Sequence, residues 1–189
     1  MTHRPWRTLS RTTLLSRLPW LEVGTETVEL PDGRVVEDYL WLDHGDFVNV
    51  VALTAQGDVI CLRSYRHGPR EVSLQFPAGL MEPGEEPLAA AKRELLEETG
   101  YTASRWLPLG RFCLDSNWGG AWMHTFLAQG AVPQQAADDG DLEDIEVFLL
   151  PLAETKERVL SGEVKLLTHV AAFSLAMMSL ERSGDRNSD

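Results

Sequence analysis

The sequence has little cysteine, no excess of positive charge and no long apolar run, and each shortage excludes a class of protein. Its 189 residues include only two cysteines, Cys61 and Cys113. Their number and spacing suit neither a disulfide scaffold nor a zinc site. The net charge of −12 provides no overall positive field to attract a nucleic-acid backbone. No apolar segment reaches the roughly 20 residues that span a membrane. We therefore expect a protein of the reducing cytoplasm that binds neither nucleic acid nor membrane.

The chain can nevertheless bury a proper core, because 43% of its residues are hydrophobic. We expect one main domain with an appendage. The first 18 residues contain four arginines and no acidic residue. This composition weakly resembles an organelle transit peptide, but it fits better with a lead-in segment that lies on the surface.

Residues 79–101 carry the strongest functional signal. They begin with a loop broken by glycine and proline and continue with the periodicity of a helix. Pro87 suits the first helical turn, and Gly100 suits the left-handed residue that ends a helix. One face of this helix is apolar, and three carboxylates gather on the other: Glu94, Glu97 and Glu98. Since like charges one turn apart repel, such a group indicates a divalent cation, most simply Mg²⁺.

The spacing of this stretch resembles the Nudix box at every fixed position. The matching residues are Gly79, Glu85, Arg93 to Leu95, Glu97, Glu98, Gly100 and Tyr101. Nudix enzymes hydrolyse a nucleoside diphosphate linked to another group, with Mg²⁺ or Mn²⁺ as cofactor. The resemblance implies an α/β (α+β) fold, a mixed β-sheet sandwiched between helices. The alternative interpretation is a solvated acidic helix face on an unrelated domain.

The resemblance also implies a role for each matching residue. The expected metal ligands are Glu94, Glu98 and the carbonyl oxygen of Ala78, with Glu97 as a further ligand or a support for one. The expected structural residues are Gly79, Glu85, Arg93 and Gly100, of which Glu85 and Arg93 would form an ion pair. The expected catalytic residues are Glu97, Glu98 and a general base on the loop of residues 131–146. Glu143 matches that base best and Asp141 second, although a solvated acidic loop is the alternative.

A cationic cluster precedes the box, with Arg66 as the best candidate for a diphosphate contact and Arg63 as the second. A guanidinium matches phosphate oxygens in a two-pronged geometry. This region resembles the sugar-diphosphate branch of the family, in which Pro-Ala-Gly opens the box. Two departures stand out. Gln75 occupies a position where that branch often has Glu. Asn117 stands about where ADP-ribose pyrophosphatases commonly have proline.

The N-terminal part is expected to form a β-extension. Residues 21–30 and 35–42 read as two strands around a Pro-Asp-Gly turn. Because two strands alone are marginal in water, they must pack on the rest of the chain or on a second copy. Enzymes that resemble ADP-ribose pyrophosphatases exchange such an extension in a homodimer, where aromatic residues help to hold the base. Tyr39, Trp41 and Trp118 are candidates, and simple packing is an equal alternative for each. The expected domains are residues 1–43 (lead-in and extension), 44–181 (Nudix domain) and 182–189 (unordered tail).

The expected function is metal-dependent hydrolysis of the pyrophosphate bond in a nucleoside diphosphate sugar, ADP-ribose or a relative. The products would be a nucleoside monophosphate and a sugar phosphate. One alternative is a Nudix hydrolase of dinucleotide polyphosphates or nucleoside triphosphates. Another is a module that senses a nucleotide without cleaving it. Such sensors usually lose carboxylates of the box, and this chain keeps all of them.

Overall fold

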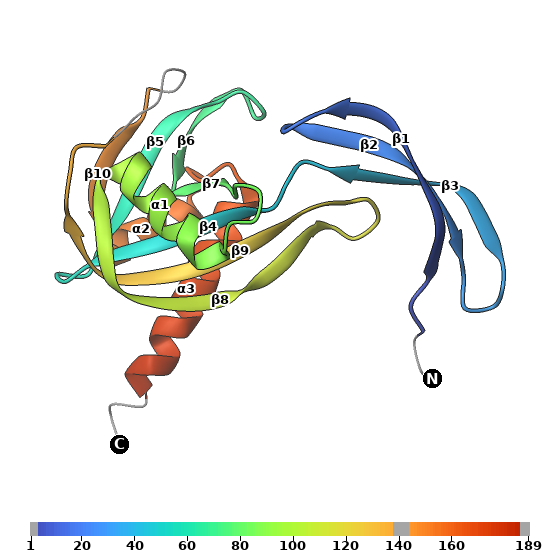
Figure 1. Cartoon of the computed structure of the whole chain (residues 1–189). Coiled ribbons are helices and arrows are strands. Elements are labelled where there is room, and N and C mark those ends of the chain that lie inside the picture. The colour runs from blue at the N-terminus through green and yellow to red at the C-terminus, as the bar shows by residue number, and fades with distance from the viewer. Residues whose placement is uncertain (1–3, 138–143, 186–189) are drawn as a thin grey trace. The chain divides into compact units, whose positions relative to one another are not determined.

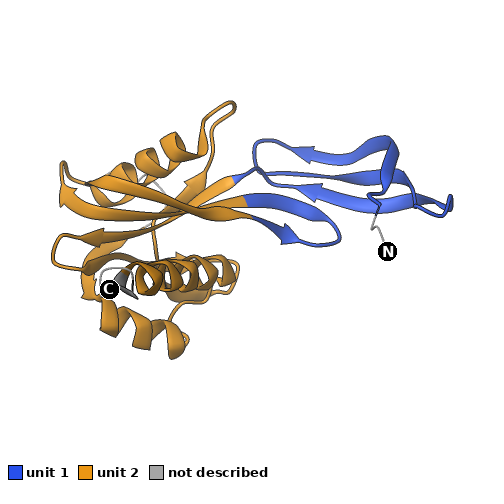
Figure 2. Cartoon of the chain, turned by 90° about the horizontal axis from the view of Figure 1, so that it is seen from below, with its two compact units in different colours: residues 1–46, 112–122 blue, residues 47–111, 123–189 orange. Residues whose placement is uncertain are grey.

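The computed structural model describes residues 4–137 and 144–185, and the chain divides into two compact units (Figure 2). Unit 1 consists of residues 1–46 and 112–122, and unit 2 consists of residues 47–111 and 123–189. The boundary expected at residue 43 lies close to the first break between the units. The inclusion of residues 112–122 in unit 1 was not predicted, because no local signal in the sequence marks it.

Unit 1 is built around three antiparallel strands. They are β1 (Arg7–Arg17), β2 (Leu21–Glu29) and β3 (Val35–Asp43), paired in that order. The predicted hairpin is confirmed, and Gly33 adopts a φ of 85° in its turn. The lead-in prediction missed β1, which is exposed along its whole length. Such a strand has no apolar–polar alternation that could reveal it in the sequence.

Unit 2 contains a mixed sheet with β4 (Phe47–Thr54) near its centre (Figure 1). One edge of β4 pairs in parallel with β9 (Gly119–Pro133). The other edge is shared by β5 (Asp58–Arg66), which pairs near Leu53, and by the short β7 (Ala78–Leu80), which pairs with residues 47–49. The remaining strands are β6 (Glu71–Gln75) and β10 (Glu146–Pro151), both beside β5, and β8 (Tyr101–Asp115) beside β9. The short strands β6 and β7 were not predicted.

Helices cover both faces of the sheet of unit 2 (Figure 2). They are α1 (Pro87–Thr99), α2 (Leu152–Leu160) and α3 (Leu167–Asp185). Ala90, Ala91 and Leu95 of α1 pack on one face. Phe173 and neighbouring residues of α3 pack on the other face, together with side chains of α2. The expected sheet between helices is therefore present.

The C-terminal helix is longer than the sequence suggested. Residues 182–185, which were expected to be unordered, continue α3, and residues 186–189 lie outside the described part of the chain. None of the helices in residues 4–137 and 144–185 combines the length and the apolar character needed to cross a membrane.

Candidate active site

Helix α1 begins and ends where the sequence predicted. Pro87 occupies its first turn, and Gly100 follows it with a φ of 75°. Gly100 also has no space for a side chain, since a Cβ atom there would lie 2.2 Å from the carbonyl oxygen of Gln135. Its own carbonyl oxygen accepts hydrogen bonds from the N–H groups of Gln134 and Gln135. The end of the helix is thereby fixed to the segment that follows β9.

The carboxylates of Glu94 and Glu98 converge on the start of β7. The N–H of Ala78 donates a hydrogen bond to Glu98 Oε2 at 2.8 Å. A Cβ atom on Gly79 would lie only 2.2–2.3 Å from the three carboxylate atoms of Glu94, so glycine alone permits this approach. The structure thus brings together three of the residues expected to bind a metal: Ala78, Glu94 and Glu98.

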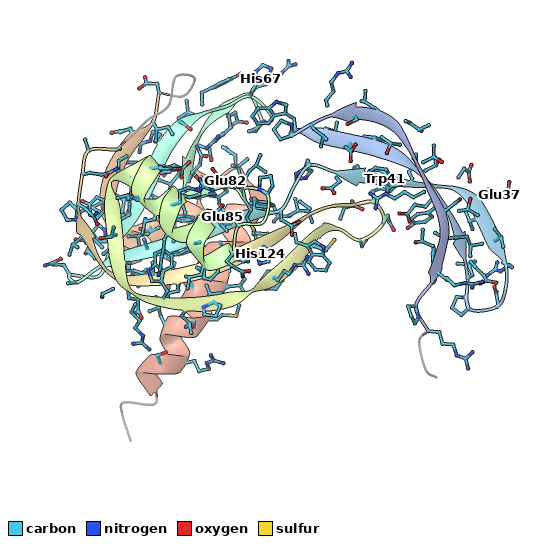
Figure 3. All side chains as sticks on the ribbon, viewed as in Figure 1. Glu37, Trp41, His67, Glu82, Glu85 and His124 are labelled. Atoms are coloured by element: carbon cyan, nitrogen blue, oxygen red, sulfur yellow. The ribbon has the colours of Figure 1, made fainter. Side chains whose placement is uncertain are left out.

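Arg93 is the centre of an ion-pair network around the box. Its guanidinium donates to Glu85 at 2.9 and 3.0 Å, to Glu94 at 2.7 Å and to Glu97 at 3.0 Å. It also donates to the carbonyl oxygen of Leu80 at 3.0 Å, which links the helix to the strand before it. The expected ion pair between Glu85 and Arg93 is therefore present. Glu85 comes from the loop that precedes α1 (Figure 3).

Of the carboxylates beside Arg93, Glu85 and Glu94 respond differently to their surroundings. The hydrogen bond from Arg93 lowers the pKa of Glu85. Burial raises the pKa of Glu94 in spite of Arg93, and the residue is only 9% exposed. Burial makes the charged form of this carboxylate unfavourable, and a bound cation would stabilise that charged form.

The residues around Gly79 match the coordination needs of the divalent cation that the box implies. In the described residues, no three His, Cys, Asp or Glu side chains form a cluster that could hold a metal by themselves. Mg²⁺ does not require one, because it usually binds through one or two carboxylates, several waters and substrate phosphates. Two carboxylates supply such oxygens: the buried Glu94 beside Gly79, and Glu98 beside Ala78. The donor set fits Mg²⁺ or Mn²⁺.

The two candidate arginines lie on opposite faces of the sheet. Leu74 and Phe76 belong to the core under α3, so Gln75 between them faces α1. Arg66 donates from Nε to Oε1 of Gln75 and therefore lies on the α1 face. The structure thus brings Arg66 to the face of the sheet that carries the box.

Arg63 lies on the other face, and its expected diphosphate contact is not supported. Its Nη1 donates to Glu146 at 2.8 Å, and its guanidinium lies 4.6 Å from the ring centroid of Phe148. Phe148 packs against the core under α3. Because residues three apart on a strand point in opposite directions, Arg63 and Arg66 cannot serve one site from regular β5.

The three aromatic candidates lie around one cavity of unit 1, with a volume of about 330 Å³. Trp41 is only 6% exposed, and the guanidinium of Arg11 lies 3.5 Å from its ring centroid. It therefore packs within the unit and offers a base little free surface. Trp118 is 49% exposed, and Tyr39 is half-buried with its ring edge against Trp6. Two further lining residues, Arg11 and Trp122, were not predicted because neither lies in a recognisable motif.

The expected general base Glu143 and its alternative Asp141 lie outside the described residues. Their role stays a prediction. The described chain resumes before β10, where Glu146 forms the ion pair with Arg63.

Comparisons with known proteins relate this chain to a family and to a fold. The family model for the NUDIX domain matches residues 43–169. The ADP-ribose pyrophosphatase of Bacillus subtilis is 32% identical over 145 residues, 76% of this chain and 78% of that protein. The ADP-ribose pyrophosphatase of Mycobacterium tuberculosis is 30% identical over 142 residues, 74% of this chain and 68% of that protein. A crystal structure of an ADP compounds hydrolase matches with a TM-score of 0.78 and 23% identity, over 97% of this chain and 98% of that one. This last likeness concerns the fold, and it confirms the expected fold class.

Proposed function

Because the chain belongs to the Nudix family, we propose that it hydrolyses the pyrophosphate bond of nucleoside diphosphate sugars, ADP-ribose or a relative. The products are a nucleoside monophosphate and a sugar phosphate. The observation that carries the proposal is the convergence of Glu94 and Glu98 on Ala78 and Gly79, with Arg66 on the same face of the sheet. The names of the pyrophosphatase relatives support the substrate class.

Each residue near the box has a part in this reaction. Glu94, Glu98 and the carbonyl oxygen of Ala78 would hold Mg²⁺ or Mn²⁺, which would neutralise phosphate charge and lower the pKa of water. Arg93 keeps Glu94 and Glu97 in position by bonding to both. Arg66 binds the diphosphate, because a guanidinium and phosphate oxygens form strong charge-assisted hydrogen bonds.

The remaining parts of the substrate site are the general base and the contact with the base of the nucleotide. The general base is Glu143, as the resemblance implies. The base of the nucleotide stacks on Tyr39 and Trp118 in the cavity of unit 1, where both rings keep exposed surface.

The active form is a homodimer in which unit 1 packs on a second copy. Its strand β1 is exposed throughout, and large apolar side chains such as Leu18 and Trp20 are 72% and 70% exposed. A small antiparallel sheet with this much exposed apolar surface gains stability when a second molecule covers it. The enzyme works in the cytoplasm, in keeping with its two free cysteines, Cys61 and Cys113.

A substrate panel tests the proposal. The purified chain is incubated with Mg²⁺ or Mn²⁺ and, in parallel, with ADP-ribose, other nucleoside diphosphate sugars, dinucleotide polyphosphates and nucleoside triphosphates. Chromatography should show a nucleoside monophosphate and a sugar phosphate from the first two groups at the highest kcat/KM. Preferred cleavage of either of the other groups would reject the proposed substrate class. Light scattering during size-exclusion chromatography tests the homodimer.

A further inference from the structure

Gln75 is a buried amide on the α1 face of the sheet, and its hydrogen bonds reach residues of both β5 and β6. Its side chain is fully buried. Oε1 accepts the hydrogen bond from Arg66 Nε, and Nε2 donates to Ser64 Oγ at 2.8 Å. Nε2 also lies 3.4 Å from the carbonyl oxygen of Ser73, a second acceptor. Gln75 thus connects the candidate diphosphate arginine to the framework of strands β5 and β6.

The surroundings of the amide determine which way it points. The reversed orientation would turn its NH₂ group toward the N–H of Arg66, so that two donors would face each other. It would also turn the carbonyl oxygen toward the carbonyl oxygen of Ser73. The observed orientation therefore fixes the plane of the guanidinium through its Nε, and a guanidinium held in plane meets a phosphate with less loss of conformational entropy.

The neutral charge of this residue is as important as its hydrogen bonds. A glutamate at position 75 would place a carboxylate beside Arg66 and add one negative charge to the face of the sheet that must receive an anionic diphosphate. Glutamine makes the same hydrogen bond to Nε and adds no charge of its own. The added carboxylate would partly neutralise Arg66 and would repel the diphosphate, and charge interactions at short range are strong in a partly buried site. The difference between Glu and Gln at position 75 should therefore appear in the affinity for substrate.

We propose that Gln75 is a positioning residue for substrate recognition: it orients Arg66 toward the diphosphate without opposing the substrate's charge. This inference rests on the proposed function, because it assigns the diphosphate contact to Arg66. A purely structural role, closing the β5–β6 pair, is the competing explanation. The two explanations differ in their effects on KM and in their dependence on Arg66.

Steady-state kinetics of ADP-ribose hydrolysis separate them. Gln75→Glu should raise KM roughly tenfold and change kcat less than about threefold, since the lost interaction is made with the bound substrate as well as with the transition state. The increase in KM should shrink in high salt, because the added charge acts electrostatically. The near-isosteric Gln75→Met, which removes the bond to Arg66 and adds no charge, should also raise KM, but without this salt dependence.

A double-mutant cycle with Arg66 gives the decisive result. In an Arg66→Ala background, the neutral Gln75→Met should have almost no further effect on KM, since both changes act through the same guanidinium. An unchanged KM in Gln75→Glu or in Gln75→Met, or an equal effect of Gln75→Met with and without Arg66, would overturn the inference. If the position 75 variants fail to fold, Ser64→Ala carries the test. This variant removes the hydroxyl oxygen that accepts the hydrogen bond from Gln75 Nε2. It should raise KM about threefold when Arg66 is present and should have no effect on KM in the Arg66→Ala background. An unchanged KM in the presence of Arg66 would reject the proposal.

The failure of this inference can be told apart from the failure of the proposed function. If the wild-type chain cleaves no nucleoside diphosphate sugar, the proposed function fails. Calorimetric titration with magnesium pyrophosphate then still measures the anion contact. Weaker binding in Gln75→Met, absent in the Arg66→Ala background, would support the positioning role, and equal binding in all variants would reject it.

Discussion

Replacing Gly79 with alanine should disable the site while leaving the fold largely intact. The added Cβ atom would lie 2.2 Å from Cδ and Oε1 of Glu94 and 2.3 Å from Oε2, whereas ordinary van der Waals contacts begin at 3.4 Å. The carboxylate must therefore move by about 1 Å or more, and misplacement of this size lowers a rate by roughly 10²-fold. We expect kcat/KM to fall by about that factor and the concentration of Mg²⁺ needed for half-maximal activity to rise.

The effect on stability should be modest and should leave the protein folded. Gly79 is not in the left-handed region, so alanine introduces no backbone strain, and the atoms that must yield belong to the end of a side chain. Overpacking of this kind typically reduces the free energy of unfolding by about 1–3 kcal/mol. Urea denaturation, followed by circular dichroism, measures this cost independently of activity.

Two controls make the test of Gly79 specific. A Cβ atom on Gly68 would meet no heavy atom within 4 Å, and Gly68 has no left-handed φ, so Gly68→Ala should keep wild-type kcat/KM. If Gly79→Ala acts through Glu94, combining it with Glu94→Gln should lower the rate no further than Glu94→Gln alone. A Gly79→Ala variant within threefold of wild-type activity would show that the position of Glu94 does not matter.

Three further measurements examine the catalytic and stability roles. Glu98→Gln should abolish turnover with little change in Tm, because the amide oxygen can still accept the hydrogen bond from Ala78; activity close to wild type in Mg²⁺ would remove the metal role of Glu98. Glu143→Gln should lower kcat by roughly 10²-fold or more and change KM little, as expected for a general base; if only Asp141→Asn did so, Asp141 would be the base. Burial lowers the pKa of His169 to about 3, against an ordinary value of 6.5. The unfolded chain therefore binds this proton first, and the stabilising contribution, complete above pH 6.5, is lost as the pH falls toward 3. Urea denaturation should show about 2 kcal/mol less stability from this residue at pH 5.0 than at pH 7.5. His169→Asn keeps a hydrogen-bond acceptor at this position and should remove that part of the pH dependence of the free energy of unfolding. An unchanged pH dependence in this variant would show that His169 is not its source.

The structure adds a reason for the departure at position 75 that the sequence alone left unexplained. The resemblance to the sugar-diphosphate branch implied only that Gln75 stands at a position where that branch often has Glu. The hydrogen bonds to Arg66 and Ser64 show that the amide has a defined orientation and a partner expected to bind substrate. The presence of Gln instead of Glu at position 75 therefore predicts a measurable difference in the charge of the site.

Some features of this protein could be predicted because their causes are local. Helix α1 runs from Pro87 to Thr99 since proline fits a first turn and Gly100 accepts the left-handed conformation that ends a helix. The grouping of Glu94 and Glu98 on one face follows from helical periodicity alone. The hairpin of β2 and β3 likewise follows from a few turn residues, including Gly33.

Other features depended on contacts between residues far apart in the sequence. The sequence could not show that Gly79 leaves space for Glu94, nor that residues 112–122 join the N-terminal strands, because both depend on how distant segments pack. Arg63 and Arg66 were both candidates from one cationic cluster, with Arg66 preferred. Only the pairing of β5 with β6 and β10 decided which of them shares a face with α1. Local rules therefore determined helix α1 and the position of its carboxylates. Strand register, which is set by long-range packing, decided which of the two arginines lies on the same face of the sheet as these carboxylates.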